Sequence, residues 1–224
     1  GVEALVRWQN PALGLVPPGR FIALAEQTSL IEDIGDWCLN EACRQIVCWQ
    51  TEGVAIPRVA VNVSARQLRG EGFAERVMET IRQHGIKPQQ LELELTESLL
   101  TEDTDHTFEI FKELRAQGIR IAIDDFGTGY SSLKYLADFP VDVLKIDQSF
   151  VSRLHAQSES LYVVQAIVML AKGLNIETVA EGVETQAQMD CLRELDCAAY
   201  QGFLCSAALP ASEFTRWMTG QSGT

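Results

Sequence analysis

The feature that most constrains the fold is a regular alternation of short apolar runs with longer segments of helical periodicity. Strands are predicted at 2–8, 58–62, 91–95, 120–124, 143–146, 177–180 and 199–203. Helices are predicted at 18–27, 31–50, 72–84, 103–117, 131–136, 159–174, 185–195 and 211–218. This alternation is typical of a parallel sheet with helical crossovers. We therefore predict seven parallel strands in one α/β domain over residues 1–224.

Two α/β architectures fit this order, an open doubly wound sheet and a closed (β/α)8 TIM-type barrel. A doubly wound nucleotide-binding sheet usually has a glycine-rich loop after its first strand. Here that position reads Arg7-Trp8-Gln9-Asn10-Pro11. The sequence therefore favours the barrel, although its predicted strands number one fewer than eight.

Charge and hydropathy exclude several classes of protein. The chain has 18 Lys and Arg against 31 Asp and Glu, a formal net charge of −13. Nucleic acids are held mainly by basic side chains, so we predict no nucleic-acid partner. No apolar run reaches the ~20 residues of a membrane span, so we expect no membrane contact by this segment. The six cysteines form no CxxC pair and are expected to be reduced thiols.

Each predicted strand delivers a polar side chain near its carboxyl end. One such acid is usually a helix cap or a solvated rim residue, but a repeated pattern at one rim points to the mouth where barrel enzymes place their sites. Crowded carboxylates repel each other unless cations are bound. Oxygen ligands suit Mg²⁺ or Mn²⁺ better than Zn²⁺. The set is Glu3, Asn62, Glu94, Asp124, Asp125, Lys145, Glu181 and Gln201.

The five carboxylates of this set suit two divalent ions better than one. Two ions about 3.5–4 Å apart are the arrangement used for in-line phosphodiester cleavage. Adjacent Asp124 and Asp125 are suited to touch both ions. Lys145 either orients or deprotonates the attacking water, or forms an internal salt bridge with Asp147 or Glu181; these interpretations are compatible.

Several sequence blocks resemble a known family, and they occur in the family's order over nearly the whole chain. The blocks are Glu3-Ala4-Leu5-Val6-Arg7-Trp8, Asn62-Val63-Ser64, Glu94-Leu95-Thr96-Glu97, Asp124-Asp125-Phe126-Gly127-Thr128-Gly129-Tyr130, Lys145-Ile146-Asp147, Glu181-Gly182-Val183-Glu184 and Gln201-Gly202-Phe203. With these blocks the chain resembles the EAL domain, the bacterial cyclic di-GMP phosphodiesterase.

The resemblance implies hydrolysis of cyclic di-GMP to linear pGpG with two Mg²⁺ or Mn²⁺ ions, and inhibition by Ca²⁺. The implied metal ligands are Glu3, Asn62, Glu94, Asp124, Asp125 and Glu181. Glu181, Lys145 and Asp124 are the implied catalytic residues. The implied substrate-binding residues are Arg7, Asp147, Glu184 and Gln201. Glu97 is expected to anchor the loop 126–132, which contains Gly127, Thr128 and Gly129 and couples the site to a partner in a homodimer.

Two other functions remain open, a non-catalytic cyclic di-GMP receptor and a barrel hydrolase of another phosphate ester. The presence of every implied metal ligand favours the phosphodiesterase. The sequence departs from the family at Phe203, often Tyr, and at Ala207-Ala208, often Arg-Pro. Both departures affect the expected substrate rim rather than the metal ligands.

The resemblance also implies a context for the chain. We expect a cytoplasmic domain, or the cytosolic part of a membrane-anchored signalling protein, with an upstream sensor or GGDEF domain. In the family a strand precedes the Glu-Ala-Leu segment and pairs with it. We therefore expect an EAL domain truncated at its N-terminus, with the first strand of its barrel absent.

Overall fold

The computed structural model describes residues 1–100, 104–129, 133–155 and 158–221. They belong to two compact units. The first unit comprises Gly1–Glu94, Glu113–Ile119 and Pro210–Thr224, and the second comprises Leu95–Lys112 and Arg120–Leu209. None of the described helices combines the length and apolar character that crossing a membrane requires.

The first unit contains the parallel strands β1 (Val2–Ala4), β4 (Val59–Asn62) and β5 (Leu91–Thr96), and β5 continues into the second unit. Strand β4 lies between the other two, with Glu3 opposite Ala60 and Asn62 opposite Glu94. The apolar residues of β4 and β5 are buried. This register brings polar side chains to the carboxyl ends of neighbouring strands.

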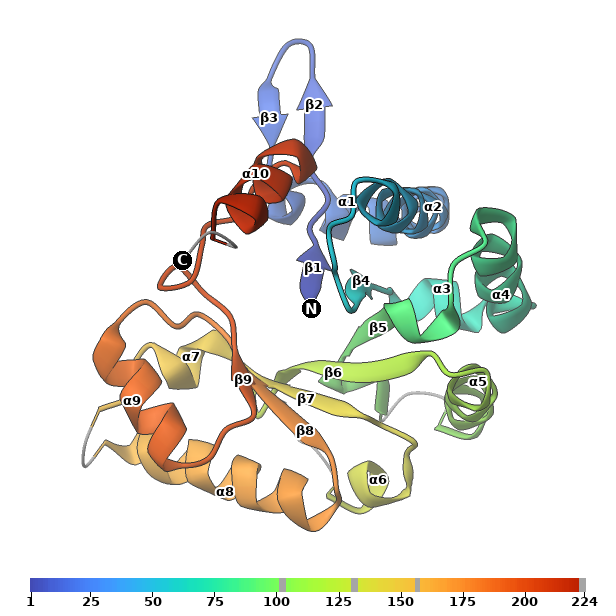
Figure 1. Cartoon of the computed structure of the whole chain (residues 1–224). Helices are drawn as coiled ribbons and strands as arrows, with labels where there is room; N and C mark the ends of the chain where they lie inside the picture. Colours follow the sequence, from blue (N-terminus) through green and yellow to red (C-terminus); the bar gives the residue numbers. More distant parts are fainter. Residues whose placement is uncertain (101–103, 130–132, 156–157, 222–224) are drawn as a thin grey trace. The chain divides into compact units, whose positions relative to one another are not determined.

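The single strand predicted at 2–8 is wrong, because the structure has a short strand followed by a β-hairpin. Strand β1 ends at Ala4, and β2 (Trp8–Asn10) pairs antiparallel with β3 (Gly14–Val16). The Asn10 side chain accepts hydrogen bonds from the backbone N–H groups of Ala12 and Leu13, at 2.9 and 3.0 Å. Asn-Pro and a following Gly are turn signals, so the sequence did carry a sign of this hairpin. In Figure 1 the hairpin stands away from α2 of the same unit.

The long helix α2 (Leu30–Thr51) organises the helices of the first unit. Trp49 on its buried face donates through Nε1 to Thr215 Oγ1 at 2.9 Å and packs against the Phe214 ring, which holds α10 to α2. Helix α3 was not predicted; Ser64 caps it by accepting from Gln67 N. The other elements are η1 (Pro18–Arg20), α1 (Ile22–Glu26), α3 (Ala65–Arg69), α4 (Phe73–His84), η2 (Pro88–Gln90) and α10 (Ala211–Gln221).

The second unit contains β6 (Arg120–Phe126), β7 (Val143–Ile146), β8 (Glu177–Ala180) and β9 (Ala199–Tyr200), each parallel to the next. The end of β5 precedes β6 in the hydrogen-bonded order. Among the described residues the parallel strands follow the order β1-β4-β5-β6-β7-β8-β9, which confirms the predicted count of seven. Strand β9 ends at Tyr200 and is shorter than predicted. Beyond it, Val183 N donates to the Gln201 carbonyl at 3.0 Å and Leu204 N donates to the Val183 carbonyl at 2.9 Å.

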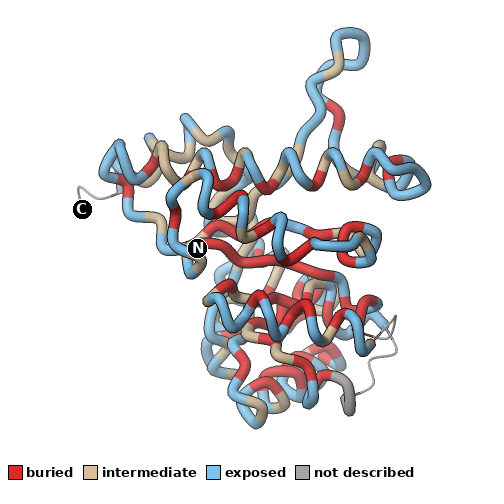
Figure 2. The backbone as a smooth tube through the Cα atoms, turned by 90° about the vertical axis from the view of Figure 1, so that its right-hand side faces the viewer, coloured by how far each residue is buried: buried red, intermediate tan, exposed pale blue. Residues whose placement is uncertain are grey.

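Side-chain caps define several helix starts in the second unit. Ser158 accepts from Leu161 N at the start of α8, and Thr185 forms a capping box with Gln188 at the start of α9. Helix α7 was not predicted. The elements are η3 (Glu97–Leu100), α5 (Thr104–Ala116), α6 (Leu133–Asp138), α7 (Gln148–Val151), α8 (Glu159–Gly173) and α9 (Gln186–Glu194). Figure 2 shows buried and exposed residues alternating along the helices, as amphipathic helices require.

All six cysteines are free thiols. Burial raises the pKa of the Cys38 and Cys43 thiols to about 11. Both side chains therefore stay protonated at neutral pH and serve as small apolar residues of α2.

Candidate metal centre

A local irregularity at the end of β6 brings two adjacent carboxylates together. The pairing of β6 with β7 shifts register between Ile123 and Phe126. Asp125 has a φ of 54°, in the left-handed region that Asp tolerates better than most residues. In a regular strand, consecutive side chains point to opposite faces. The irregularity removes that restriction for Asp124 and Asp125.

Glu181, which follows β8, completes this acidic group. One carboxylate oxygen from each of Asp124, Asp125 and Glu181 lies within 4.8 Å of the others. The backbone N–H of Asp125 donates to Asp124 Oδ1 at 2.9 Å, which fixes the orientation of that carboxylate. Three oxygens this close form a group able to hold a hard divalent cation.

Lys145 on β7 is buried beside these acids, with 3% of its side chain exposed. Its Nζ lies 2.7 Å from Glu181 Oε1 and 3.3 Å from Asp124 Oδ1. The sequence had offered Asp147 or Glu181 as a salt-bridge partner, and the structure gives Glu181 together with Asp124. One ammonium therefore offsets part of the negative charge of this group.

The electrostatics of Asp125 also fit a cation site. Burial raises the pKa of the Asp125 carboxyl, and the charges of Asp124 and Asp147 raise it further against the opposing effect of Lys145. A raised pKa means that the ionised carboxylate is disfavoured here. A bound divalent cation would reverse this effect, because it stabilises the charged form.

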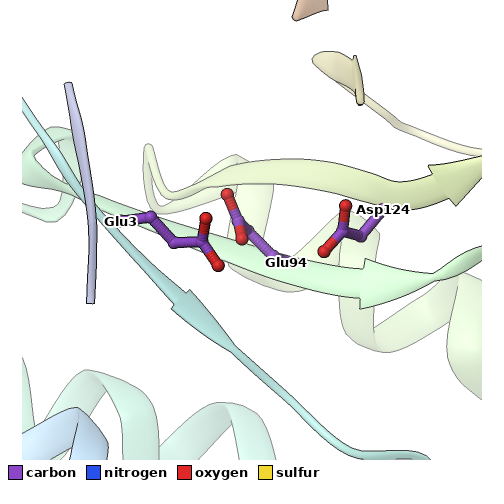
Figure 3. Close-up of side chains that lie close together, drawn as sticks. All are labelled: Glu3, Glu94 and Asp124. Carbon is purple, nitrogen blue, oxygen red and sulfur yellow. The ribbon is translucent and has the colours of Figure 1, made fainter. Parts of the chain in front are cut away.

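The first unit offers a second oxygen-rich group on β1, β4 and β5. Asn62 Nδ2 donates to Glu3 Oε1 at 2.8 Å. Glu94 is buried, with 3% exposure, and one of its carboxylate oxygens lies within 4.8 Å of one of Glu3. Figure 3 shows the side chains of Glu3 and Glu94 directed toward one another. Carboxylate and amide oxygens are ligands that Mg²⁺ and Mn²⁺ accept.

Glu97 holds the backbone that follows Asp125. Its Oε2 accepts from Gly127 N at 2.7 Å and from Gly129 N at 3.4 Å. The Thr128 hydroxyl donates to the carbonyl oxygen of Asp125 at 2.9 Å. The segment 127–129 is thus tied both to a buried carboxylate and to the candidate site. Residues 130–132 of the expected loop lie outside the described residues.

Phe150 also positions this segment and was not among the sequence candidates. Gly127 has a φ of 102°, and a Cβ there would lie 2.9 Å from the Phe150 ring. Glycine at this position is therefore required both by the backbone angle and by the close approach. No spacing in the sequence reveals a contact between two residues this far apart along the chain.

The candidate substrate residues have different surroundings. Asp147 is buried and accepts from Ser149 N at 2.9 Å, so its carboxylate caps α7. Arg7 is exposed and donates to the carbonyl of Val6. Glu184 is exposed after β8, and Gln201 is half-buried with its backbone paired to the segment around β8. Asp147 therefore has a structural role whatever else it contacts.

These observations define a class of protein: an α/β protein whose parallel strands carry oxygen-rich groups at their carboxyl ends that could hold a metal ion. Comparison with protein families finds the EAL domain over residues 1–208. The chain belongs to the EAL domain family.

Among known relatives, the chain is 47% identical over 213 residues to the bifunctional diguanylate cyclase/cyclic di-GMP phosphodiesterase MucR of Pseudomonas aeruginosa. It is 42% identical over 217 residues to the cyclic di-GMP phosphodiesterase NbdA of the same organism. The alignments cover 95% and 97% of this chain but only 31% and 28% of the relatives. The chain thus spans about a third or less of their length.

The fold is shared with solved structures. The PaMucR phosphodiesterase in its c-di-GMP complex superposes with a TM-score of 0.90 at 46% identity, covering 95% of this chain and 86% of that one. This similarity confirms the fold class that the alternation predicted, the TIM-barrel-like α/β fold of EAL domains.

Proposed function

We propose that this chain hydrolyses cyclic di-GMP to linear pGpG in a reaction that depends on divalent metal ions. The observation that carries the proposal is the group of Asp124, Asp125 and Glu181 around the buried ammonium of Lys145. MucR and NbdA are named cyclic di-GMP phosphodiesterases, and PaMucR has been solved with c-di-GMP. These relationships support the assignment of the substrate.

The donor sets fit Mg²⁺ or Mn²⁺. Both groups offer only carboxylate and amide oxygens, without cysteine or histidine, which suits hard cations. We propose that both groups serve two such ions in one reaction. When bound, the ions stabilise negative charge on the phosphate and make hydroxide available at neutral pH. The proposed ligands are Glu3, Asn62, Glu94, Asp124, Asp125 and Glu181.

We assign the proton-accepting role to Glu181 and an orienting role to Lys145. Lys145 lies 2.7 Å from a Glu181 oxygen and 3.3 Å from an Asp124 oxygen, and the negative charge of these two carboxylates favours its ammonium form. A protonated ammonium cannot accept a proton, whereas a carboxylate can. Lys145 instead fixes the directions of Glu181 and Asp124, so that Glu181 receives the proton from the attacking water.

The remaining residues bind the substrate in this proposal. The exposed guanidinium of Arg7 binds a phosphate oxygen, and Glu184 and Gln201 form hydrogen bonds with the dinucleotide. The water oxygen forms a bond to phosphorus while the bond from phosphorus to the ribose O3′ breaks. The O3′ leaves as a hydroxyl with the proton that Glu181 took from the water, and the product is the linear dinucleotide pGpG.

Assembly and context remain predictions. We propose a homodimer that forms through the loop after Asp125, because Glu97 ties that loop to the candidate site. The cytoplasmic location and the upstream sensor or GGDEF domain likewise follow from the family resemblance. Sedimentation of the purified chain with and without Mg²⁺ would test whether the homodimer forms.

The function is tested by incubating the purified chain with cyclic di-GMP and Mg²⁺ or Mn²⁺ and separating the products by chromatography. We expect pGpG from the wild type and at least ~10³-fold slower turnover from Glu181→Gln, corresponding to about 4 kcal/mol of lost transition-state stabilisation. Glu194→Gln is the matched control, since Glu194 is an exposed acid on α9. Tight binding of cyclic di-GMP without any product would contradict catalysis and support a receptor.

A further inference from the structure

The outer face of α2 carries a straight row of residues opposite the face that packs into the first unit. The buried positions of α2 are Ile31, Gly35, Leu39, Ala42, Cys43, Ile46 and Trp49. The outer row has alternating spacings of four and three residues, which keeps side chains in line along a helix. We call this row the α2 ridge; it consists of Leu30, Ile34, Trp37, Glu41, Arg44 and Cys48.

The first half of the α2 ridge is apolar and open to solvent. Leu30 and Trp37 are each 57% exposed, and Ile34 between them is half-buried. A single exposed leucine needs no explanation, but a contiguous apolar row is typical of an interaction site. Tryptophan in particular is enriched among the residues that dominate binding energy at interfaces.

The second half of the α2 ridge is polar and satisfies its own hydrogen bonds. The Arg44 guanidinium forms a fork with Glu41, at 2.7 Å from Nε to Oε2 and 2.6 Å from Nη2 to Oε1. Its Nη1 lies 3.3 Å from Cys48 Sγ. The Arg44 guanidinium is therefore already paired within α2. We expect a partner to bind through the apolar half of the ridge and the residues beside it.

Acidic side chains flank the apolar half. Helix α2 carries four acidic residues and one basic residue. Glu32 is paired with Arg66 at 2.7 Å, and Glu41 with Arg44. Asp33 and Asp36 are exposed, and the described part of the chain provides no cationic partner for either. A second copy would bring the same acids and a formal net charge of −13, so like charges oppose self-association.

We propose that the α2 ridge binds a basic amphipathic helix of another protein segment. Apolar residues of that helix, spaced by three and four, pack against Leu30, Ile34 and Trp37. Its Lys or Arg residues face Asp33 and Asp36, which steers association and sets the orientation. The ridge contains none of the proposed metal ligands, so this inference stands apart from the proposed phosphodiesterase activity.

The probe for the test is a fluorescein-labelled helical peptide of about 14 Leu and Lys residues, with leucines at alternating spacings of three and four. Its counterpart keeps the leucines and replaces every Lys with Glu. Fluorescence anisotropy measures binding of each peptide to the full chain. We expect saturable binding of the Lys peptide that weakens with added salt, and none of the Glu peptide.

Surface variants locate the binding site. Trp37→Gln and Leu30→Lys are expected to weaken binding of the Lys peptide at least tenfold, and Asp33→Asn with Asp36→Asn to weaken it and flatten its salt dependence. Leu15→Lys is the matched control, because Leu15 is a 63% exposed leucine on the hairpin, and it should bind like the wild type. Thermal melts and turnover of cyclic di-GMP should be unchanged in all variants.

Four results would overturn the proposal. The first two are binding of the Lys peptide that does not saturate up to ~1 mM, and binding of the Glu peptide as tight as that of the Lys peptide. The third is a Leu15→Lys variant that weakens binding of the Lys peptide as much as Trp37→Gln does. The fourth is self-association of the chain that Trp37→Gln abolishes. The last result would make a second copy the occupant. None of them bears on hydrolysis of cyclic di-GMP, so the two proposals fail separately.

Discussion

The two oxygen-rich groups differ in what accompanies their carboxylates. In the first unit, Glu3 accepts from the neutral amide of Asn62. In the second unit, Asp124 and Glu181 contact the buried ammonium of Lys145. An ammonium offsets carboxylate charge, whereas a neutral amide provides hydrogen bonds without any charge. The second group is therefore partly neutralised by its own fold, and we expect the two groups to respond differently to substitution and to metal.

The largest expected effect tests whether both groups serve one reaction. Glu3→Ala and Asp124→Asn should each lower the turnover of cyclic di-GMP by ~10³-fold or more, about 4 kcal/mol, because each removes a proposed metal ligand. The measurement is the rate of pGpG formation at saturating Mg²⁺ or Mn²⁺. Unchanged turnover in Glu3→Ala alone would restrict the metal centre to the second unit.

The next effect concerns stability and applies only to the second group. Lys145→Met leaves Asp124 and Glu181 without their ammonium, and removing one partner of a buried ion pair costs about 3–5 kcal/mol. We expect a loss of about 2–4 kcal/mol in urea unfolding of the metal-free chain, since the two carboxylates are partly exposed. Mg²⁺ should restore part of it.

Lys112→Met is the control for that experiment. Lys112 pairs with Glu109 on the surface, with both side chains more than half exposed, so its removal should change the unfolding free energy by less than about 0.5 kcal/mol. Equal stability of the two variants would show that Lys145 does not offset the charge of its neighbours.

Calcium should separate metal binding from turnover. Ca²⁺ accepts oxygen ligands but with looser geometry than Mg²⁺, so it should bind the acidic groups without supporting hydrolysis. At about one hundred times its Kd, binding to the folded state alone adds about 2.7 kcal/mol, which thermal unfolding detects. Turnover in Ca²⁺ equal to that in Mg²⁺ would contradict the proposed two-metal reaction.

The smallest expected effect comes from Asp125. Its pKa is raised in the folded chain, so the folded state retains a proton to higher pH than the unfolded state. Stability of the metal-free chain is therefore expected to fall as pH rises through that raised pKa. Asp125→Asn removes the titrating group and, because Asn also tolerates the left-handed region, should stabilise the metal-free chain at neutral pH.

The Asp125 carboxyl is only partly buried, and solvent screening limits the gain from Asp125→Asn to about 0.5 kcal/mol. Urea unfolding between pH 4 and pH 8 would measure it, and the pH dependence of the variant should be flatter than that of the wild type. A variant that is less stable at every pH would show that the carboxylate of Asp125 is favourable in the folded chain even without metal.

Regular secondary structure was the part of the fold most accessible from sequence. Strands β7 and β8 and helix α2 lie at or within one residue of their predicted ends, because apolar runs bounded by turn residues and long stretches of helical periodicity both carry a clear signal. Two short helices and the hairpin were missed. Helices α3 and α7 depend on caps by Ser64 and Asp147, and the hairpin depends on the Asn10 turn, where local side-chain hydrogen bonds outweigh periodicity.

The sequence by itself determined which strands are parallel and that polar side chains gather near their carboxyl ends, because alternation and strand-end position are properties of the chain order. Only the tertiary structure decided how those side chains are arranged. Three features show this: the register shift beside Asp125, the ion pairs of Lys145 with Glu181 and Asp124, and the close approach of Phe150 to Gly127. Each of them joins residues from different strands and loops. Such contacts depend on packing distances between elements, which no local pattern encodes.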